Sequence, residues 1–133
     1  MELQRIEYDF TVCKIDNIGQ ANFAGEFVFL SKTDDEISLV CQSEYVPVGA
    51  TASEAGWRAL KISGVLPFGM VGVIAKIANI LAQDGISIFV VSTYNTDYIL
   101  VKATSLEKCV QALERNGYVV KQPLPEDTNR GTL

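Results

Sequence analysis

Residues 64–103 decide the fold of this 133-residue chain and read GVLPFGMVGVIAKIANILAQDGISIFVVSTYNTDYILVKA. A loop with glycine and proline, Gly64–Pro67, leads into apolar residues at three- and four-residue spacing, which predict a helix from about Gly69 to Gln83. Two β-prone runs, Ile86–Thr93 and Tyr98–Ala103, follow around a short polar turn and predict a hairpin. The apolar stripe of the helix is expected to consist of Val71, Ile74, Ile77, Ala78 and Leu81.

The segments on either side complete a repeating order of strands and helices. Trp57–Ser63 alternates in polarity and predicts a strand, and Thr104–Glu107 has the form of a capping box that opens a second helix. Tyr118–Lys121 predicts a short closing strand. The order βαββαβ indicates an α+β fold, a ferredoxin-like sandwich with both helices on one face of a four-stranded antiparallel sheet. The right-handed crossover rule makes its first two strands parallel, with the third between them.

The N-terminal part resembles the same unit without full-length helices. Tyr8–Ile15 predicts a strand, and Glu26–Lys32 and Ile37–Gln42 predict a hairpin around a polar turn. The connecting segments are too short or too loop-like for full helices, although a helical turn is expected around Ala52–Ala55. We therefore expect a degenerate N-terminal unit over 1–56, a complete unit over 57–122 and a polar tail over 123–133.

Composition excludes several classes of function. Hydrophobic residues make up 48% and charged residues 20%, which is typical of a folded chain. The net charge of −5 and the lack of Lys/Arg clusters argue against nucleic acid and against an anionic membrane surface. No apolar run reaches the ~18 residues that a membrane span needs. The start, MELQRIEYDF, lacks the features of a secretory signal, so a cytoplasmic location is expected.

The set of reactive side chains in the sequence predicts that the protein is not an enzyme. There is no histidine, which removes the commonest general base and zinc ligand. Cys13, Cys41 and Cys109 are isolated and are expected to be reduced, buried apolar residues. The acidic run Asp34–Glu36 is expected to be a solvated turn. We predict no catalytic residue, no metal site and no cofactor.

Two ends of the opening stretch are expected to meet in space and to bind a small molecule. In this topology the loop Leu66–Val73 and the turn Thr93–Asp97 lie at one edge of the sheet. The loop offers backbone N–H groups and a positive helix end, where Gly69 and Gly72 allow close approach; this suits a carboxylate. Asp97 suits an ammonium group. Side by side, the two elements predict a free α-amino acid as ligand.

Each element also has a purely structural interpretation. Gly69 and Gly72 are equally consistent with tight packing of the loop against the helix. Residues 93–97 are turn formers, so they are also consistent with a simple hairpin turn in which Asp97 caps backbone N–H groups. These alternatives stay open at the level of sequence.

The motifs together resemble the ACT domain, a small regulatory module that binds ligands. They are the proline–phenylalanine loop, Gly72–Ala78, Gly85–Phe89 and Ser92–Val101. More narrowly, the chain resembles small bacterial tandem ACT-like proteins and the ligand-binding halves of the cytosolic arginine sensors of animal cells. The resemblance is tight over about residues 57–120 and looser before them.

This resemblance implies a set of ligand contacts. Those sensors carry an acidic pair where this chain has Gly69 and Met70, so the resemblance leaves the identity of the amino acid open. The implied contacts are Leu66, Pro67, Gly69, Met70, Val71, Gly72, Val73, Thr93, Tyr94 and Asp97.

The sequence therefore predicts a non-catalytic, amino-acid-binding regulatory protein whose site lies near an interface between units. An exposed sheet edge predicts a homodimer. The main alternative is a structural or oligomerisation module with a vestigial ligand site. An acyl-phosphate hydrolase of this topology would need an arginine in the loop 64–72, which has none. An RNA-binding sheet would need a basic field.

Overall fold

The structure is a computed structural model that describes residues 1–67 and 69–123. Within this part, the chain forms one seven-stranded sheet, two α-helices and three short 3-10 helices. The strands are β1 (Glu2–Ile15), β2 (Val28–Lys32), β3 (Ile37–Gln42), β4 (Ala52–Ile62), β5 (Phe89–Ser92), β6 (Asp97–Lys102) and β7 (Val119–Lys121). The helices are α1 (Val73–Gln83), α2 (Leu106–Arg115), η1 (Ile18–Gln20), η2 (Ser43–Tyr45) and η3 (Ala103–Ser105).

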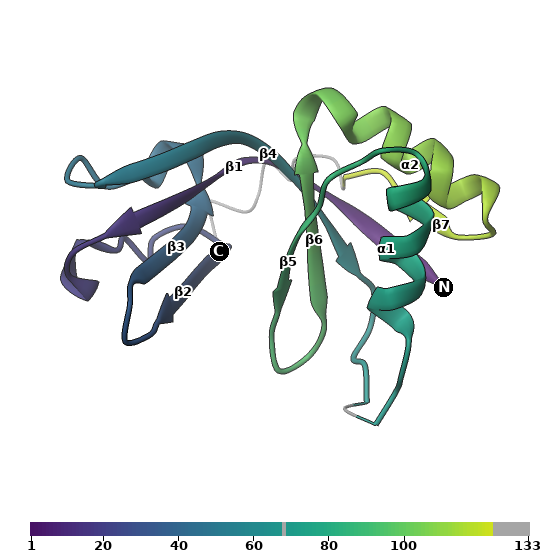
Figure 1. The fold of residues 1–133 in the computed structure, drawn as a ribbon, viewed down its shortest axis with the longest axis horizontal. Helices are drawn as coiled ribbons and strands as arrows, with labels where there is room; N and C mark the ends of the chain where they lie inside the picture. Colours follow the sequence, from purple (N-terminus) through teal and green to yellow (C-terminus); the bar gives the residue numbers. More distant parts are fainter. Residues whose placement is uncertain (68, 124–133) are drawn as a thin grey trace, which may run out of the picture.

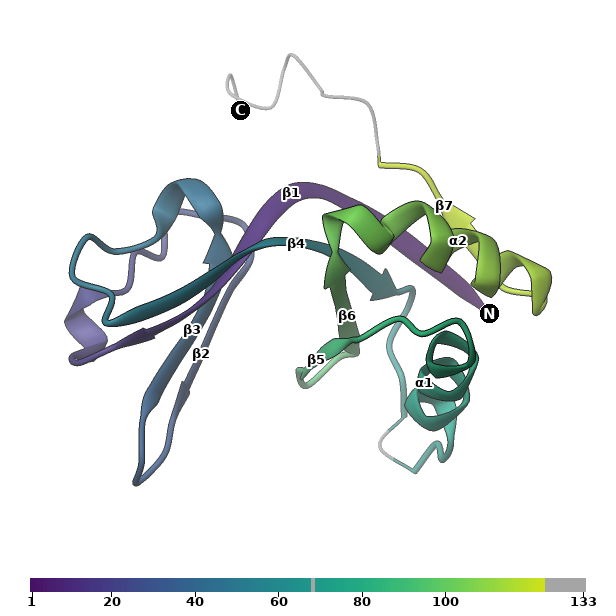
Figure 2. The same ribbon diagram turned by 45° about the horizontal axis from the view of Figure 1, so that its top comes forward.

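Two long strands run through both halves of the molecule. The sheet order is β2-β3-β1-β4-β6-β5, and β7 pairs in parallel with the first residues of β1. Figure 1 shows β2 and β3 on one side, β5, β6 and both α-helices on the other, and β1 and β4 passing between them. The second view shows the same strands bending from one half into the other (Figure 2). The expected placement of β6 between β4 and β5 is confirmed.

The first strand is longer than its sequence pattern indicated, and this changes the sheet. It begins at Glu2 and not at Tyr8, and its first part lies between β4 and β7. The four strands expected for residues 57–121 are therefore part of one larger sheet, and the closing strand pairs with β1. Leu3 and Ile6 are both buried but belong to two different cores, so the start of β1 lacks the one-sided alternation on which the strand prediction relied.

The fourth strand also starts earlier than expected. Residues 52–55 are extended and pair with the end of β1, where Cys13 lies opposite Ser53, so the helical turn expected there is wrong. A second register shift lies beside Gly56, whose φ of +87° is the left-handed conformation that glycine tolerates best. The boundary that we expected between residues 56 and 57 falls inside this continuous strand.

Both α-helices pack on one face of the sheet. Ile77 and Leu81 of α1 and Cys109 and Leu113 of α2 are fully buried in one core with strand residues such as Leu60. The apolar face expected for α2 is confirmed. Its start differs, because η3 precedes it and no side chain caps it, so the capping box does not form. Val71 precedes α1 and is 90% exposed, so it is not part of the helical stripe.

The opposite face of the sheet joins the two halves through aromatic side chains. Tyr98 of β6 has its ring centroid 5.0 Å from that of Phe29 and 6.1 Å from that of Phe27. Trp57 is 7% exposed and belongs to the same cluster. The predicted hairpins β2–β3 and β5–β6 both form. No helix in the described part of the chain is long and apolar enough to cross a bilayer. Apart from Pro123, the expected C-terminal tail lies outside the described residues.

Candidate functional site

A pocket of about 270 Å³ lies where the loop between β4 and α1 meets the turn between β5 and β6. Both segments lie at the same end of the sheet, at the bottom of Figure 1. The volume is close to the lower end of the roughly 300–1,000 Å³ that is usual for ligand pockets, so it suits a small molecule. The walls are formed by Leu66, Pro67, Met70, Gly72, Val73, Ile74, Ala75, Thr93, Tyr94, Asn95, Thr96 and Asp97.

Backbone and side-chain hydrogen bonds hold these two segments together. The Leu66 N–H donates to the Asn95 carbonyl at 2.8 Å, which ties the loop to the turn. Thr96 is buried, and its hydroxyl donates to the Ile62 carbonyl at 2.9 Å at the end of β4. The Thr93 N–H and hydroxyl both donate to the Thr96 carbonyl at 2.9 Å. The pocket walls are therefore positioned by bonds that need no ligand.

The first turn of α1 presents open hydrogen-bond donors to the pocket. Gly72 is the N-cap with φ +79°, and no side chain caps the helix. The first helical bond of the turn runs from the Lys76 N–H to the Gly72 carbonyl at 3.0 Å. The N–H groups of Val73, Ile74 and Ala75 therefore lack intrahelical acceptors, and all three residues line the pocket. Such a helix end carries partial positive charge and favours an anion.

Asp97 supplies the only carboxylate among the residues that line this pocket. It is the first residue of β6 and is half-buried. Its carboxylate has no hydrogen-bond or ion-pair partner among the described residues. One wall thus offers donors and positive potential, and another offers an uncompensated negative charge. This arrangement can bind a small molecule with both an anionic and a cationic group.

The structure brings most of the predicted site residues together. Those that line the pocket are Leu66, Pro67, Met70, Gly72, Val73, Thr93, Tyr94 and Asp97. Gly69 does not line it, and Val71 lines a neighbouring pocket instead. Ile74 and Ala75 were not predicted, whereas Asn95 and Thr96 belong to the predicted turn 93–97 without being among the implied contacts. Ile74 and Ala75 were missed because the helix was expected to begin near Gly69, which placed its open donors too early in the chain.

The two glycines can now be assigned different roles. A Cβ added to Gly69 or Gly72 would meet no described atom within 4 Å beyond the adjacent residues. Tight packing of the loop against the helix therefore does not require glycine at either position. Gly72 is needed for its left-handed conformation, whereas Gly69 has no positive φ.

The described residues offer no exposed thiol and no metal-binding cluster. Cys13, Cys41 and Cys109 are all buried free thiols. Burial raises the pKa of Cys41 to about 11 and that of Cys109 to about 12, and it also raises the pKa of Cys13. Neutral, inaccessible thiols are poor nucleophiles. No group of three or more Cys, Asp or Glu side chains in residues 1–67 and 69–123 could hold a metal ion.

Comparison with known proteins supports the ACT family. The family model for the ACT domain matches residues 52–115, which contain every residue that lines the pocket. None of the curated proteins compared with the chain matches it.

Solved structures of similar fold span nearly the whole chain. Protein Atu0741 from Agobacterium tumefaciens is 28% identical with a TM-score of 0.83, and the match covers 95% of this chain and 96% of that one. VC0802 from Vibrio cholerae, described as a possible transport protein, is 20% identical with a TM-score of 0.67 over 86% of this chain and 88% of that one. The regulatory subunit of aspartate kinase from Thermus thermophilus is 12% identical with a TM-score of 0.61, and the match covers 85% of this chain and 95% of that one.

Proposed function

We propose that this chain is a non-catalytic ACT-type regulatory protein that binds a free α-amino acid. The observation that carries the proposal is the pocket in which the uncapped start of α1 and the unpaired carboxylate of Asp97 line one small volume. ACT domains are generally regulatory modules for small molecules, and one neighbour of the same fold is the regulatory subunit of aspartate kinase.

The charges of the pocket suit the two ends of an α-amino acid. The carboxylate accepts hydrogen bonds from the N–H groups of Val73, Ile74 and Ala75 at the positive end of α1. The ammonium group lies against Asp97. From the sequence, the backbone of residues 69–72 was expected to bind this carboxylate. Because α1 begins at Val73, the proposed donors are instead the N–H groups of residues 73–75.

The N-terminal half is a degenerate counterpart of the half that contains the pocket. Its order of elements is β1-η1-β2-β3-η2-β4, and that of the other half is β4-α1-β5-β6-η3-α2-β7. The 3-10 helix η1 stands in place of α1 and η2 corresponds to η3, while α2 has no counterpart among the described residues. The strands β3 and β6 begin at Ile37 and Asp97, and the 3-10 turns after them begin at Ser43 and Ala103, so both pairs are 60 residues apart. An unrelated arrangement would have no reason to keep one spacing over two successive elements.

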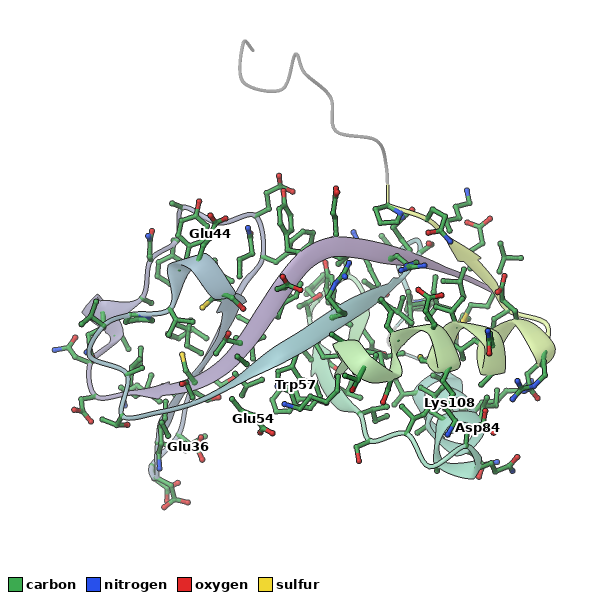
Figure 3. All side chains as sticks on the ribbon, turned by 90° about the horizontal axis from the view of Figure 1, so that it is seen from above. Glu36, Glu44, Glu54, Trp57, Asp84 and Lys108 are labelled. Atoms are coloured by element: carbon green, nitrogen blue, oxygen red, sulfur yellow. The ribbon has the colours of Figure 1, made fainter. Side chains whose placement is uncertain are left out.

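The two hairpin turns also share their hydrogen bonds. The Thr33 N–H donates to the Glu36 carbonyl at 2.9 Å, and the Thr93 N–H donates to the Thr96 carbonyl at the same distance. In each turn the threonine hydroxyl also bonds to the backbone of the residue three positions later. Glu36 lies in the first hairpin turn, far from the α-helices (Figure 3). The turn beside the pocket thus has a counterpart in the first hairpin, and in this proposal its function depends on the residues that differ between the two turns.

The N-terminal half lacks both recognition elements of the pocket. Its first helical turn is closed by its own side chains, because Asn17 and Gln20 form a capping box over the N–H groups. The corresponding Gly72 has no side chain to do this. Ile37 occupies the position that corresponds to Asp97 and offers no charge. Amino-acid binding therefore belongs to the C-terminal half alone.

A second copy of the chain covers the rim of the pocket in this proposal. The exposed apolar residues Val65, Met70, Val71 and Tyr94 are between 46% and 90% exposed and lie in the two segments that form the site. The edge strands β2 and β5 are open for pairing in the order of the sheet. A homodimer that uses this surface would respond to ligand through its differential affinity for the two assembly states. The free amino acid and the second copy are the partners.

The test is binding of amino acids to the wild-type chain and to Asp97→Asn. Thermal-shift screening against each common amino acid should find at least one that raises the melting temperature by mass action. Calorimetry with that amino acid should give an affinity at least about tenfold lower for Asp97→Asn, because a charge-assisted bond is lost. Asp35→Asn, in the corresponding turn of the first hairpin, is the matched control and should bind as the wild type does.

Two outcomes would contradict this proposal. If no amino acid stabilises the wild-type chain, the alternative of an oligomerisation module with a vestigial site is favoured. If an amino acid binds equally well to Asp97→Asn, the carboxylate does not hold the ammonium group. Light scattering with and without the ligand tests the homodimer, and a strict monomer in both states would exclude it.

A further inference from the structure

A second pocket adjoins the first one on the other side of the start of α1. Its volume is about 390 Å³. Met70, Gly72 and Val73 line both pockets, so the two cavities share a wall at the start of the helix. The remaining walls come from the N-terminal end of β1, from α1 and from the segment between α2 and β7. Those residues are Met1, Val71, Lys76, Asn116, Gly117 and Tyr118.

Among the residues that the structure describes, Lys76 has the only charged side chain that lines the second pocket. It makes no ion pair with any described residue, and the first turn of α1 contains no acidic residue. The Cα–Cβ bond of a helical residue tilts toward the helix N-terminus, so the side chain of Lys76 extends back over the first turn, toward the shared wall. A cation in this position is unfavourable for the helix itself, because it adds to the positive end of the dipole. Lys76 thus opposes the stability of α1 locally and provides a positive charge in the wall of the second pocket.

The neighbouring walls suit an aliphatic stem. Met70 and Val73 line both cavities. They supply apolar surface between the first pocket, which holds the α-carboxylate and the ammonium group of the ligand, and the second pocket, which Lys76 lines. The negative charge of Asp97 lies in the first pocket, and no acidic side chain from residues 1–67 and 69–123 lines the second. The two charged side chains therefore lie on opposite sides of the shared wall. The carboxylate of Asp97 lies in the first pocket and the ammonium of Lys76 in the second. A positively charged ligand side chain would meet Lys76 as a like charge and be disfavoured.

We infer that the second pocket receives the side-chain carboxylate of the bound amino acid, and that Lys76 selects a dicarboxylic amino acid. The inference rests on the proposed function, because the α-carboxylate and the ammonium group of the same ligand occupy the first pocket. The methylene stem passes over the exposed edge of the shared wall at Met70, and the distal carboxylate pairs with the ammonium of Lys76. Lys76 is then the residue that determines specificity, and it contacts only the side chain of the ligand.

The experiment compares glutamate with glutamine, which has the same shape without the charge, by calorimetry at low ionic strength. The wild-type chain should bind glutamate at least about tenfold more tightly than glutamine, because one charge-assisted bond is worth that much. In Lys76→Met the stem length and helix propensity are kept but the charge is lost. This variant should bind the two ligands equally, with its affinity for glutamine unchanged. 2-Aminoadipate has one methylene more than glutamate and tests how long a side chain can be and still place its carboxylate at Lys76. Its affinity should fall in Lys76→Met, as that of glutamate should.

Lys108→Met is the matched control, because Lys108 lies on the other helix, α2, and lines neither pocket (Figure 3). It should keep the preference for glutamate. Binding of glutamine as tightly as glutamate in the wild type overturns the inference, and so does a preference that survives Lys76→Met. Both of these results leave the proposed function standing, since an amino acid still binds. Failure of every amino acid to bind the wild type overturns the proposed function, and the inference with it.

Discussion

Thr96 shows how one residue can set the geometry of the site without carrying charge. It is 3% exposed, and its hydroxyl donates to the Ile62 carbonyl at 2.9 Å, which fixes the β5–β6 turn to the end of β4. The neighbouring Asn95 carbonyl accepts the N–H of Leu66, so the loop is fixed to the same turn. Asp97 follows directly in the chain. Its position opposite the start of α1 is therefore a consequence of the buried hydroxyl beside it.

Cys109 gives the stability of the protein a defined dependence on alkaline pH. Burial raises the pKa of its thiol from the ordinary value of 9.0 to about 12. Between these two values the unfolded chain loses the thiol proton and the folded chain keeps it, so the free energy of unfolding falls as the pH rises. Below pH 9 this contribution is fully present. Urea unfolding at a series of pH values from 7 upward should show the fall.

Cys109→Ala isolates this contribution from the tyrosines and lysines that titrate in the same range. The variant should lose stability less steeply above pH 9 than the wild type, although its stability at pH 7 is lower because a buried group has been truncated. Equal slopes for the two proteins above pH 9 would show that the thiol is not protected. In the native wild type, all three cysteines should also resist modification by a thiol reagent at pH 8, since each is buried.

At the scale of elements, the start of α1 depends on the conformation of one glycine. Gly72 has φ +79°, which costs a residue with a Cβ about 1–2 kcal/mol. Gly72→Ala should therefore lower the free energy of unfolding by about that amount and should weaken amino-acid binding. Gly69→Ala is the matched control, because Gly69 has no positive φ and a Cβ there meets no described atom. It should leave stability unchanged in denaturant titrations. Equal stability of the two variants would contradict the role given to Gly72.

The strands β1 and β4 are elements of both halves at once. The first residues of β1 pair with β4 and β7, and the last pair with β3 and with the start of β4. Register shifts along the β1–β4 pair allow the strands to bend as they pass from one half to the other. A cut at either strand would therefore remove structure from both halves.

At the scale of the whole molecule, this sharing predicts that the C-terminal half does not fold by itself. A fragment of residues 52–123 lacks Leu3 and Ile6, which are buried in the full chain, and it lacks β1, the strand with which β7 pairs. The fragment should give no cooperative thermal transition by circular dichroism. Leu3→Ala in the full chain is the graded control and should lower stability by about 2–5 kcal/mol without abolishing the fold. A cooperative transition in the fragment would show that the unit is autonomous.

Much of the molecule follows from local patterns in the sequence. The types and order of the elements, both hairpins and the apolar face of α2 could be predicted, because periodicity reports which side of a segment is buried. The two segments that form the pocket could also be named, since the chain order βαββαβ restricts which loops share an edge. Most of the predicted site residues line the pocket for this reason. Gly69 and Val71 do not, because the start of α1 depends on the left-handed conformation at Gly72, which no periodicity reveals.

The amino-acid sequence by itself determined the chemistry available to this protein: no histidine, a glycine-bearing helix start and a net negative charge. Only the tertiary structure decided that the first residues of β1 lie between β4 and β7, that aromatic residues of both halves form one core, and that Lys76 lines a pocket that shares a wall with the first one. These features depend on which distant segments pair. Strand pairing is set by burial summed over the whole sheet, and no local stretch of the chain contains that information.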